Sequence, residues 1–313
     1  MSMKLVTQVS VGQSPFRLTH QRPLLMVGSC FTEHIGQMLS QGGFEVMQNP
    51  FGILYNPFSI VECLHRCLTL QPLGNDDMVC HHGLWHSWLH HGSFSNSDAQ
   101  QVVNSCMQSQ QRTHELMERG CQLIVTLGDA HYYTLHDTDY VVANCHKLPA
   151  SCFDLHQATP AAVVDAFVPL IERLQQYRIQ VLFTISPIRH WAYGAHGSQL
   201  GKAVLLLAVD ELVQRFPKQC FYFPAYEIVM DELRDYRFYA DDLLHPTPLA
   251  QRIIFERLIE SCADKDTQRL LGQYQMLHNM ESHRPINTDS DEYRCFEAKL
   301  TELRNEIKNN HIQ

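Results

Sequence analysis

The sequence predicts an α/β fold, a three-layer α/β/α sandwich with a mostly parallel central sheet, followed by a helical C-terminal extension. Two observations predict this architecture. Short apolar runs alternate along the chain with longer segments of helical spacing, a pattern typical of βαβ units. The runs contain few polar residues, as expected of parallel strands that are buried on both faces. They cover residues 24–27, 121–127, 180–185 and 220–223.

The intervening helices are predicted from apolar residues that recur on one face. In residues 59–70 this face carries Ile60, Leu64 and Leu68, and glycine ends the helices predicted over 31–41 and 96–120. The other helices are expected at 159–177, 198–215, 225–233 and 249–262. Shorter β segments are expected at 44–47, around Gly83 and in a hairpin within 132–142.

Composition limits the class of protein. A chain of 313 residues, 45% of them hydrophobic, can bury one main domain, which we assign to residues 1–263. The net charge of −9, without a basic stripe, argues against nucleic-acid and membrane partners. No apolar run approaches the ~20 residues that span a bilayer. Eleven cysteines without a signal-like N-terminus indicate reduced thiols, so we expect a cytoplasmic protein.

The stretch at residues 24–31, LLMVGSCF, contains the first candidate catalytic residue. An apolar run that stops at Gly28 and then takes helical spacing predicts a buried strand turning sharply into a helix. Ser29 would then lie at the carboxyl end of a strand and at a helix N-terminus, where ligands bind and free N–H groups stabilise an oxyanion. Ser29 is therefore a candidate nucleophile, although serine is also a common helix N-cap.

A second candidate group lies at residues 236–246, YRFYADDLLHP. Asp242 and His245 are separated by two residues in a segment that Pro246 keeps from continuing as a helix, so the two side chains can face the same way. This spacing suits an aspartate that orients a histidine, which then acts as general base on Ser29.

GSCF and the downstream DxxHP resemble the first and last blocks of the GSCFA family, a branch of the SGNH (GDSL-like) serine hydrolases. Four further short blocks lie between them in order: NPFGILYNP at 49–57, TLGDAHYY at 126–133, VVANCHKLP at 141–149 and TISPIRHW at 184–191. The resemblance spans most of residues 20–260. It implies an SGNH or flavodoxin-like sandwich and a Ser29, His245 and Asp242 triad that needs no metal or organic cofactor.

The resemblance also implies an oxyanion hole. The amides of Ser29 and Gly52 are the expected backbone donors, although Gly52 could simply permit a tight turn. SGNH enzymes commonly carry an asparagine after the strand that here ends at Gly128, but this sequence reads Gly-Asp there. Asn144 is the nearest replacement, and Gly128 should border the crevice because it follows a strand.

Polar residues also follow the strand predicted at 180–185. Arg189 could bind an anionic substrate through its planar guanidinium, or it could pair with Asp242. His190 is a rival general base. The histidine-rich stretch at 78–95 could offer metal ligands, but it lacks the spacing of zinc sites and is more typical of a surface that lines a substrate.

A composition change at residue 264 marks the C-terminal extension, 264–313. It comprises a polar helix, a hydrophilic linker at 281–291 and a helix with a narrow apolar stripe. The stripe consists of Phe296, Leu300, Leu303 and Ile307. It either docks on its own domain or pairs with a second copy in a homodimer.

These observations together predict a serine hydrolase that cleaves an acyl ester through an acyl-enzyme. The resemblance implies a small-molecule or carbohydrate ester, with acetyl as the expected acyl group. Two alternatives remain open. One is an O-acyltransferase on the same fold, and the other is a non-catalytic binding protein that keeps the scaffold.

Overall fold

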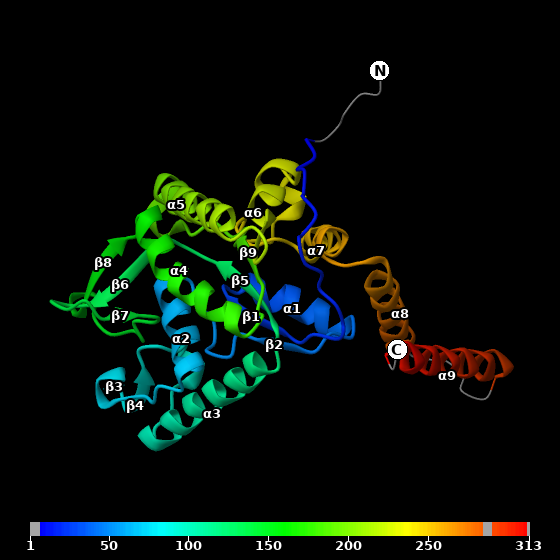
Figure 1. Ribbon diagram of the computed structural model, residues 1–313, viewed down its shortest axis with the longest axis horizontal. Helices are drawn as coiled ribbons and strands as arrows, with labels where there is room; N and C mark the ends of the chain where they lie inside the picture. Colours follow the sequence, from blue (N-terminus) through cyan, green and yellow to red (C-terminus); the bar gives the residue numbers. More distant parts are fainter. Residues whose placement is uncertain (1–6, 284–289, 312–313) are drawn as a thin grey trace.

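A parallel sheet lies at the centre of the computed structural model, which describes residues 7–283 and 290–311 (Figure 1). In the described chain its strands run in the order β10-β9-β5-β1-β2, and every neighbouring pair is parallel. The bounds are Leu24–Gly28 for β1, Val46–Gln48 for β2, Gln122–Leu127 for β5, Val181–Ile185 for β9 and Cys220–Phe223 for β10. The predicted fold class is confirmed.

The order of the strands predicts where a ligand would bind. Numbered along the chain within this sheet alone, the strands lie in the order 2-1-3-4-5, which is the flavodoxin-like doubly wound arrangement. The direction of winding reverses between β1 and β5. Ligands of such sheets bind at this reversal, outside the carboxyl ends of the strands.

Helices cover both faces of the sheet, as Figure 1 shows. Leu24 and Met26 of β1 pack toward the helices of one face, whereas Leu25 and Val27 pack toward those of the other, as the two-residue strand period requires. The first face carries α1, Phe31–Gln41, and α7, Pro248–Cys262. The second face carries α2, Pro57–Thr69, α3, Ala99–Glu118, α4, Pro160–Gln176, and α5, Gly194–Arg215.

Local sequence signals fix several helix starts. Asn56, Thr159 and Thr247 cap α2, α4 and α7, and each precedes a proline at the first helical position. Two of the differences from the predicted bounds change the local structure. The glycine-rich residues 194–197 form the first turn of α5, and the helix expected at 225–233 splits into α6, Ala225–Glu227, and a π-helical turn, Ile228–Glu232.

An accessory lobe, residues 75–96 and 131–157, lies beside the sandwich. It contains the hairpin of β3, Met78–His81, and β4, Leu84–Ser87. It also contains an antiparallel sheet of β6, His131–Leu135, β7, Val141–Val142, and β8, Phe153–Gln157. Trp88, Val142 and Phe153 form its small core.

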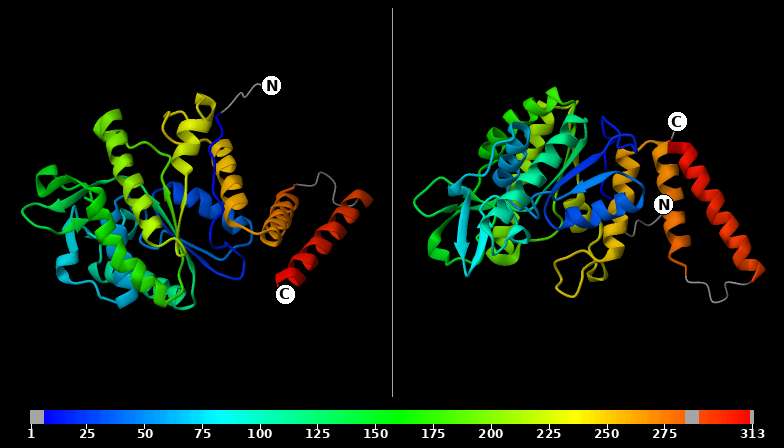
Figure 2. Two further views of the ribbon diagram at one scale, coloured as in Figure 1. Left: turned by 45° about the horizontal axis from the view of Figure 1, so that its top comes forward. Right: turned by 90° about the horizontal axis from the view of Figure 1, so that it is seen from below.

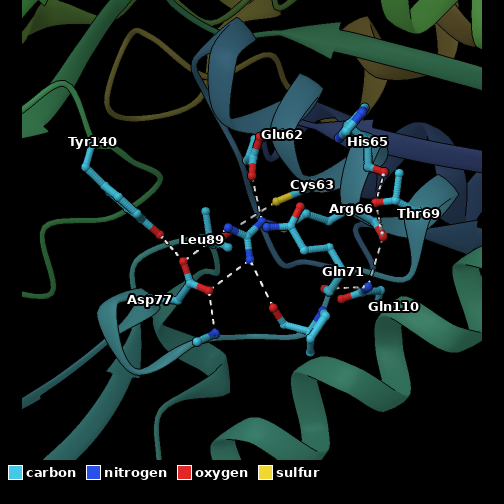
Figure 3. A network of polar contacts seen from close by, with 12 residues as sticks. Glu62, Cys63, His65, Arg66, Thr69, Gln71, Asp77, Leu89, Gln110 and Tyr140 are labelled. Atoms are coloured by element: carbon cyan, nitrogen blue, oxygen red, sulfur yellow. Dashed lines mark hydrogen bonds and ion pairs between the residues drawn. The ribbon is translucent and has the colours of Figure 1, made fainter.

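A buried polar network anchors this lobe to α2 (Figure 3). Arg66 donates two hydrogen bonds to Asp77, of 2.9 and 3.2 Å, and the Tyr140 hydroxyl donates a third, of 2.5 Å. Burial acts to raise the pKa of Asp77, but these donors and the Gly74 amide outweigh it, so the pKa lies below its ordinary value. Asp77 is therefore a carboxylate with each oxygen engaged.

The two ends of the sandwich domain are joined. The amides of Ser14 and Leu18 donate to the carbonyls of Ser261 and Cys262, 3.1 and 2.8 Å away, at the end of α7. Figure 2 shows this N-terminal segment running beside α7. Residues 1–6 and 284–289 and the last two residues lie outside the described part of the chain.

The C-terminal extension forms a pair of helices, α8, Lys265–Glu281, and α9, Asp291–His311 (Figure 2). Leu303 and Ile307 of the predicted apolar stripe pack against Leu270 of α8. In this chain, then, the stripe docks on its own neighbouring helix, while homodimer formation stays a prediction. Across the described residues, no helix is long and apolar enough to span a bilayer.

Candidate active site

The turn after β1 depends on Gly28. Its φ of +139° is unfavourable for other residues, and a Cβ there would lie 2.1 Å from the carbonyl oxygen of Thr126 on β5. The Gly28 amide donates to the Asn49 side chain at 3.0 Å, and its carbonyl accepts from the Leu54 amide, also at 3.0 Å. The loop 49–56 thus fixes the point at which β1 leaves the sheet.

Ser29 and Cys30 follow this turn and point to different surroundings. Ser29 is 1% exposed, and its hydroxyl is buried without a hydrogen-bond partner. Cys30 is half-buried at the N-cap of α1, and its Sγ lies 4.0 Å from Nε2 of His245. The structure thus gives Cys30 a contact with the imidazole and gives the Ser29 hydroxyl no hydrogen bond to it, and the role of Ser29 as nucleophile stays a prediction.

Asp242 and His245 lie in contact, as their spacing indicated. Oδ1 of Asp242 accepts hydrogen bonds from the amides of Leu244 and His245, each 2.9 Å long, and Oδ2 accepts from Nδ1 of the His245 ring. These donors lower the pKa of Asp242 to about 2. Leu243, with a φ of +60°, makes the bend that brings the two side chains together. The carboxylate thus holds the ring with Nε2 turned to Cys30.

The surroundings of Cys30 decide its protonation state. Burial raises the pKa of its thiol, while the N–H groups of Cys30 and Phe31 at the start of α1 and the charge of Lys202 act in the opposite direction. The net direction is upward. The thiol therefore loses its proton less readily than an ordinary cysteine, and a neighbouring base assists its use as a nucleophile.

Lys202 is a fully buried lysine beneath this site, and the sequence prediction missed it. Its Nζ donates to the carbonyls of Gly128 and Ser186, 2.6 and 2.8 Å away, and so joins the ends of β5 and β9. Burial lowers the pKa of Lys202 to about 7. One sequence signal could have located it, because Lys202 lies on the same helical stripe as the buried Leu205 and Val209.

The two backbone amides expected in the oxyanion hole already donate within the chain. The Ser29 amide donates to the Thr126 carbonyl at 3.2 Å. The Gly52 amide donates to the Asn49 carbonyl at 2.8 Å, so Gly52 closes a turn, and this corrects its predicted role. The Gly128 amide donates to the carbonyl of Tyr55 at 2.9 Å. Asn144 accepts from the His146 amide at 2.8 Å within the accessory lobe, and its role as a third donor stays a prediction.

Arg189 and His190 follow β9 and do not pair with Asp242. The Arg189 guanidinium lies 5.1 Å from the ring centre of Trp191. Nε2 of His190 lies 3.9 Å from Asp129, whose other oxygen is 2.9 Å from Nδ1 of His131. His190 thus belongs to a separate group around Asp129, and the proposed ion pair of Arg189 with Asp242 is absent from the described residues.

The histidines of the accessory lobe bind protein groups. Nδ1 of His86 lies 2.6 Å from Ser95 Oγ, and Nδ1 of His90 lies 2.9 Å from Ser87 Oγ. His146 stacks on His86 at 4.5 Å. In residues 7–283 and 290–311, no group of three or more histidine, cysteine, aspartate or glutamate residues is arranged to hold a metal ion.

The fold and the site define an α/β sandwich protein. At the carboxyl edge of its sheet, the thiol of Cys30 lies beside the imidazole of His245, which in turn contacts the carboxylate of Asp242. The model of the GSCFA family matches residues 23–258, and the chain belongs to that family. No curated protein matches it.

Among solved structures, the chain is similar to a Bacteroides fragilis protein described as a "putative acylhydrolase". The two share 9% sequence identity, with a TM-score of 0.40 over 82% of this chain and 91% of the other.

Proposed function

We propose that this protein is an acyl-ester hydrolase in which Cys30 is the nucleophile, His245 the general base and Asp242 the residue that orients it. The observation that carries the proposal is the 4.0 Å approach of Cys30 Sγ to Nε2 of a histidine whose Nδ1 is bonded to a carboxylate. A nucleophile, a base and an orienting group in that order define nucleophilic acyl transfer.

The reaction follows from these positions. His245 removes the thiol proton as sulfur attacks the ester carbonyl, and then gives that proton to the departing alkoxide, so that a thioester and an alcohol form. In the second half, His245 removes a proton from water as its oxygen adds to the thioester carbonyl. The C–S bond breaks, the sulfur takes the proton back, and the acid is released.

The N-terminus of α1 supplies the support for negative charge. The amides of Cys30 and Phe31 point at the sulfur, and the helix dipole favours an anion there. We infer that these amides hold the oxyanion, in place of those of Ser29 and Gly52, whose N–H groups donate to Thr126 and Asn49.

The substrate class rests on family resemblance. A small carbohydrate ester with an acetyl group is the proposed substrate, and transfer to a sugar hydroxyl is the alternative outcome. Product analysis with and without an added sugar acceptor separates the two, because hydrolysis releases free acid, whereas transfer yields an acylated sugar.

The test of the nucleophile compares p-nitrophenyl acetate hydrolysis by three single variants. Cys30→Ala should lose activity, while Ser29→Ala and Cys80→Ala, an exposed cysteine of the accessory lobe, should keep it. Rapid acid quench followed by mass spectrometry should find the acetyl group on the peptide that contains Cys30. Loss of activity in Ser29→Ala, with Cys30→Ala fully active, would overturn the assignment.

A further inference from the structure

Arg189 carries a charge that nothing in the described part of the chain neutralises. It lies just beyond β9, at the carboxyl edge of the sheet, and is half-buried. Its Nε is buried without a hydrogen-bond partner, and its guanidinium makes a cation–π approach to Trp191. An arginine that is partly removed from water costs free energy unless an anion or an acceptor meets it.

The position of Arg189 relates it to the candidate active site. Tyr226 and Tyr239 are buried enough to raise the pKa of each hydroxyl, and the charge of Arg189 acts against that rise in both. Tyr239 pairs through its backbone with Pro246, the residue after His245, and the Tyr226 ring lies 5.5 Å from Nζ of Lys202. Arg189 therefore stands near both the histidine segment and the buried lysine.

The carboxylates of this region have other partners. Both oxygens of Asp242 accept from its own segment. Asp129 bonds His131 and lies beside His190. No carboxylate of the described residues forms an ion pair with the guanidinium, so an anion from outside the chain can bind to it.

We propose that Arg189 binds an anionic group of the substrate, so that the acyl ester cleaved here carries a carboxylate or phosphate. The planar fork of arginine suits such oxygens because it can donate two parallel hydrogen bonds. Its Cζ lies 5.1 Å from the centre of the Trp191 ring, a cation–π approach that helps to position the guanidinium. This inference rests on the proposed hydrolase function and changes its substrate, because it places an anionic group on the acyl chain where that proposal has acetyl.

The first test compares two esters with the same leaving group, mono-p-nitrophenyl glutarate and p-nitrophenyl butyrate. The wild-type protein should favour the glutarate ester in kcat/KM by about tenfold or more, the usual contribution of a charged hydrogen bond. Arg189→Gln should remove this preference mainly by raising KM for the glutarate ester. Arg189→Lys should retain part of it, because it keeps the charge but loses the fork.

The matched control is Arg234→Gln. Arg234 is an exposed arginine that pairs with Asp231, and its substitution should leave kcat/KM unchanged for both esters. Equal kcat/KM values for the two esters in the wild-type protein, unchanged in Arg189→Gln, overturn the inference while the hydrolase function stands.

A second test does not require turnover. Iodoacetamide labelling of Cys30, followed by mass spectrometry, should slow when free glutarate or inorganic phosphate is present, and Arg189→Gln should abolish that protection. Protection by one anion alone identifies the kind of group that is bound. Arg189-dependent protection in a protein that cleaves no ester would refute the hydrolase function and support the anion site. Absence of protection by both anions counts against the site.

Discussion

Asp242 and Asp77 each accept several hydrogen bonds, but they differ in exposure and in the side chain with which they pair. The Asp242 side chain is 48% exposed, and its side-chain partner is His245. The Asp77 side chain is 8% exposed, and its charged partner is Arg66. Histidine can release and take up a proton near neutral pH, whereas arginine cannot.

The difference shows what separates a reactive group from a structural one here. His245 has one ring nitrogen held by a carboxylate and the other turned to a thiol, so a proton can move between them. In the network of Figure 3, each oxygen of Asp77 is already engaged by Arg66, Tyr140 or Gly74. We therefore expect substitutions at the first pair to reduce catalysis and substitutions at the second to reduce stability.

The largest expected effect is on catalysis. His245→Gln should lower kcat for ester hydrolysis by about a thousandfold or more, as is usual when a base of a catalytic triad is removed. The midpoint of urea unfolding should change little, because the ring is half exposed. His190→Gln is the control and should stay active. If His190→Gln were as inactive as His245→Gln, the assignment of His245 as the base would be wrong.

The second effect is on folding. Asp77→Asn should lower the free energy of unfolding by about 2 kcal/mol, because it removes the buried carboxylate that pairs with Arg66 and leaves Arg66 with the more exposed Glu62. Urea denaturation measures this change, with the exposed Asp137→Asn as the control. The folded fraction of Asp77→Asn should retain wild-type kcat. An unchanged free energy of unfolding would remove the distinction between the two aspartates.

The third effect is a loss of stability at acidic pH, which arises from two buried histidines of the accessory lobe. Burial lowers the pKa of both His90 and His146 to about 4. Below the unfolded-state value of ~6.5, the unfolded chain therefore binds protons that the folded chain does not. Stability should fall as pH drops from about 6.5 to 4, by up to ~1.4 kcal/mol per pH unit for each histidine. Urea unfolding at several pH values in this window measures the slope, which His90→Gln should reduce.

A smaller effect is expected at Lys202. Lys202→Met removes a nearby positive charge, so the pKa of the Cys30 thiol should rise further above its ordinary value. The pH dependence of iodoacetamide labelling at Cys30 reports this shift as a curve displaced to higher pH. Lys218→Met, at an exposed position, should leave the curve in place. A curve unmoved by Lys202→Met would show that the lysine only joins two strands.

The smallest effect is expected at Ser29. Its buried hydroxyl has no hydrogen-bond partner, so Ser29→Ala should change the free energy of unfolding by less than about 1 kcal/mol. Activity should stay within a few-fold of wild type. A large loss of activity, with the free energy of unfolding unchanged, would show that Ser29 takes part in the mechanism.

The main strands and most helices could be predicted because their signals are local. The predicted helix 31–41 coincides with α1, and the strand-to-helix turn at Gly28 forms where the apolar run ends. The contact of Asp242 with His245 is also local, since two residues separate them. Each of these features depends on a few neighbouring residues.

The identity of the residue that faces His245 could not be predicted in this way. Ser29 and Cys30 are adjacent, and neighbouring side chains point in different directions, so the choice depends on the backbone angles at Gly28. Those angles follow from the contact of Gly28 with Thr126 on another strand. Lys202 was missed for a similar reason, because its partners, Gly128 and Ser186, lie far away in the sequence.

The joining of the N-terminal segment to the end of α7 has a consequence for the order of synthesis on the ribosome. Cys30 and His245 are separated by 215 positions, and Leu18 has its partner only when Cys262 has emerged. At a synthesis rate of roughly 5–20 residues per second, His245 is added to the chain about 10–40 s after Cys30. A nascent chain shorter than 245 residues therefore has the proposed nucleophile but not the proposed base, and we expect it to be inactive.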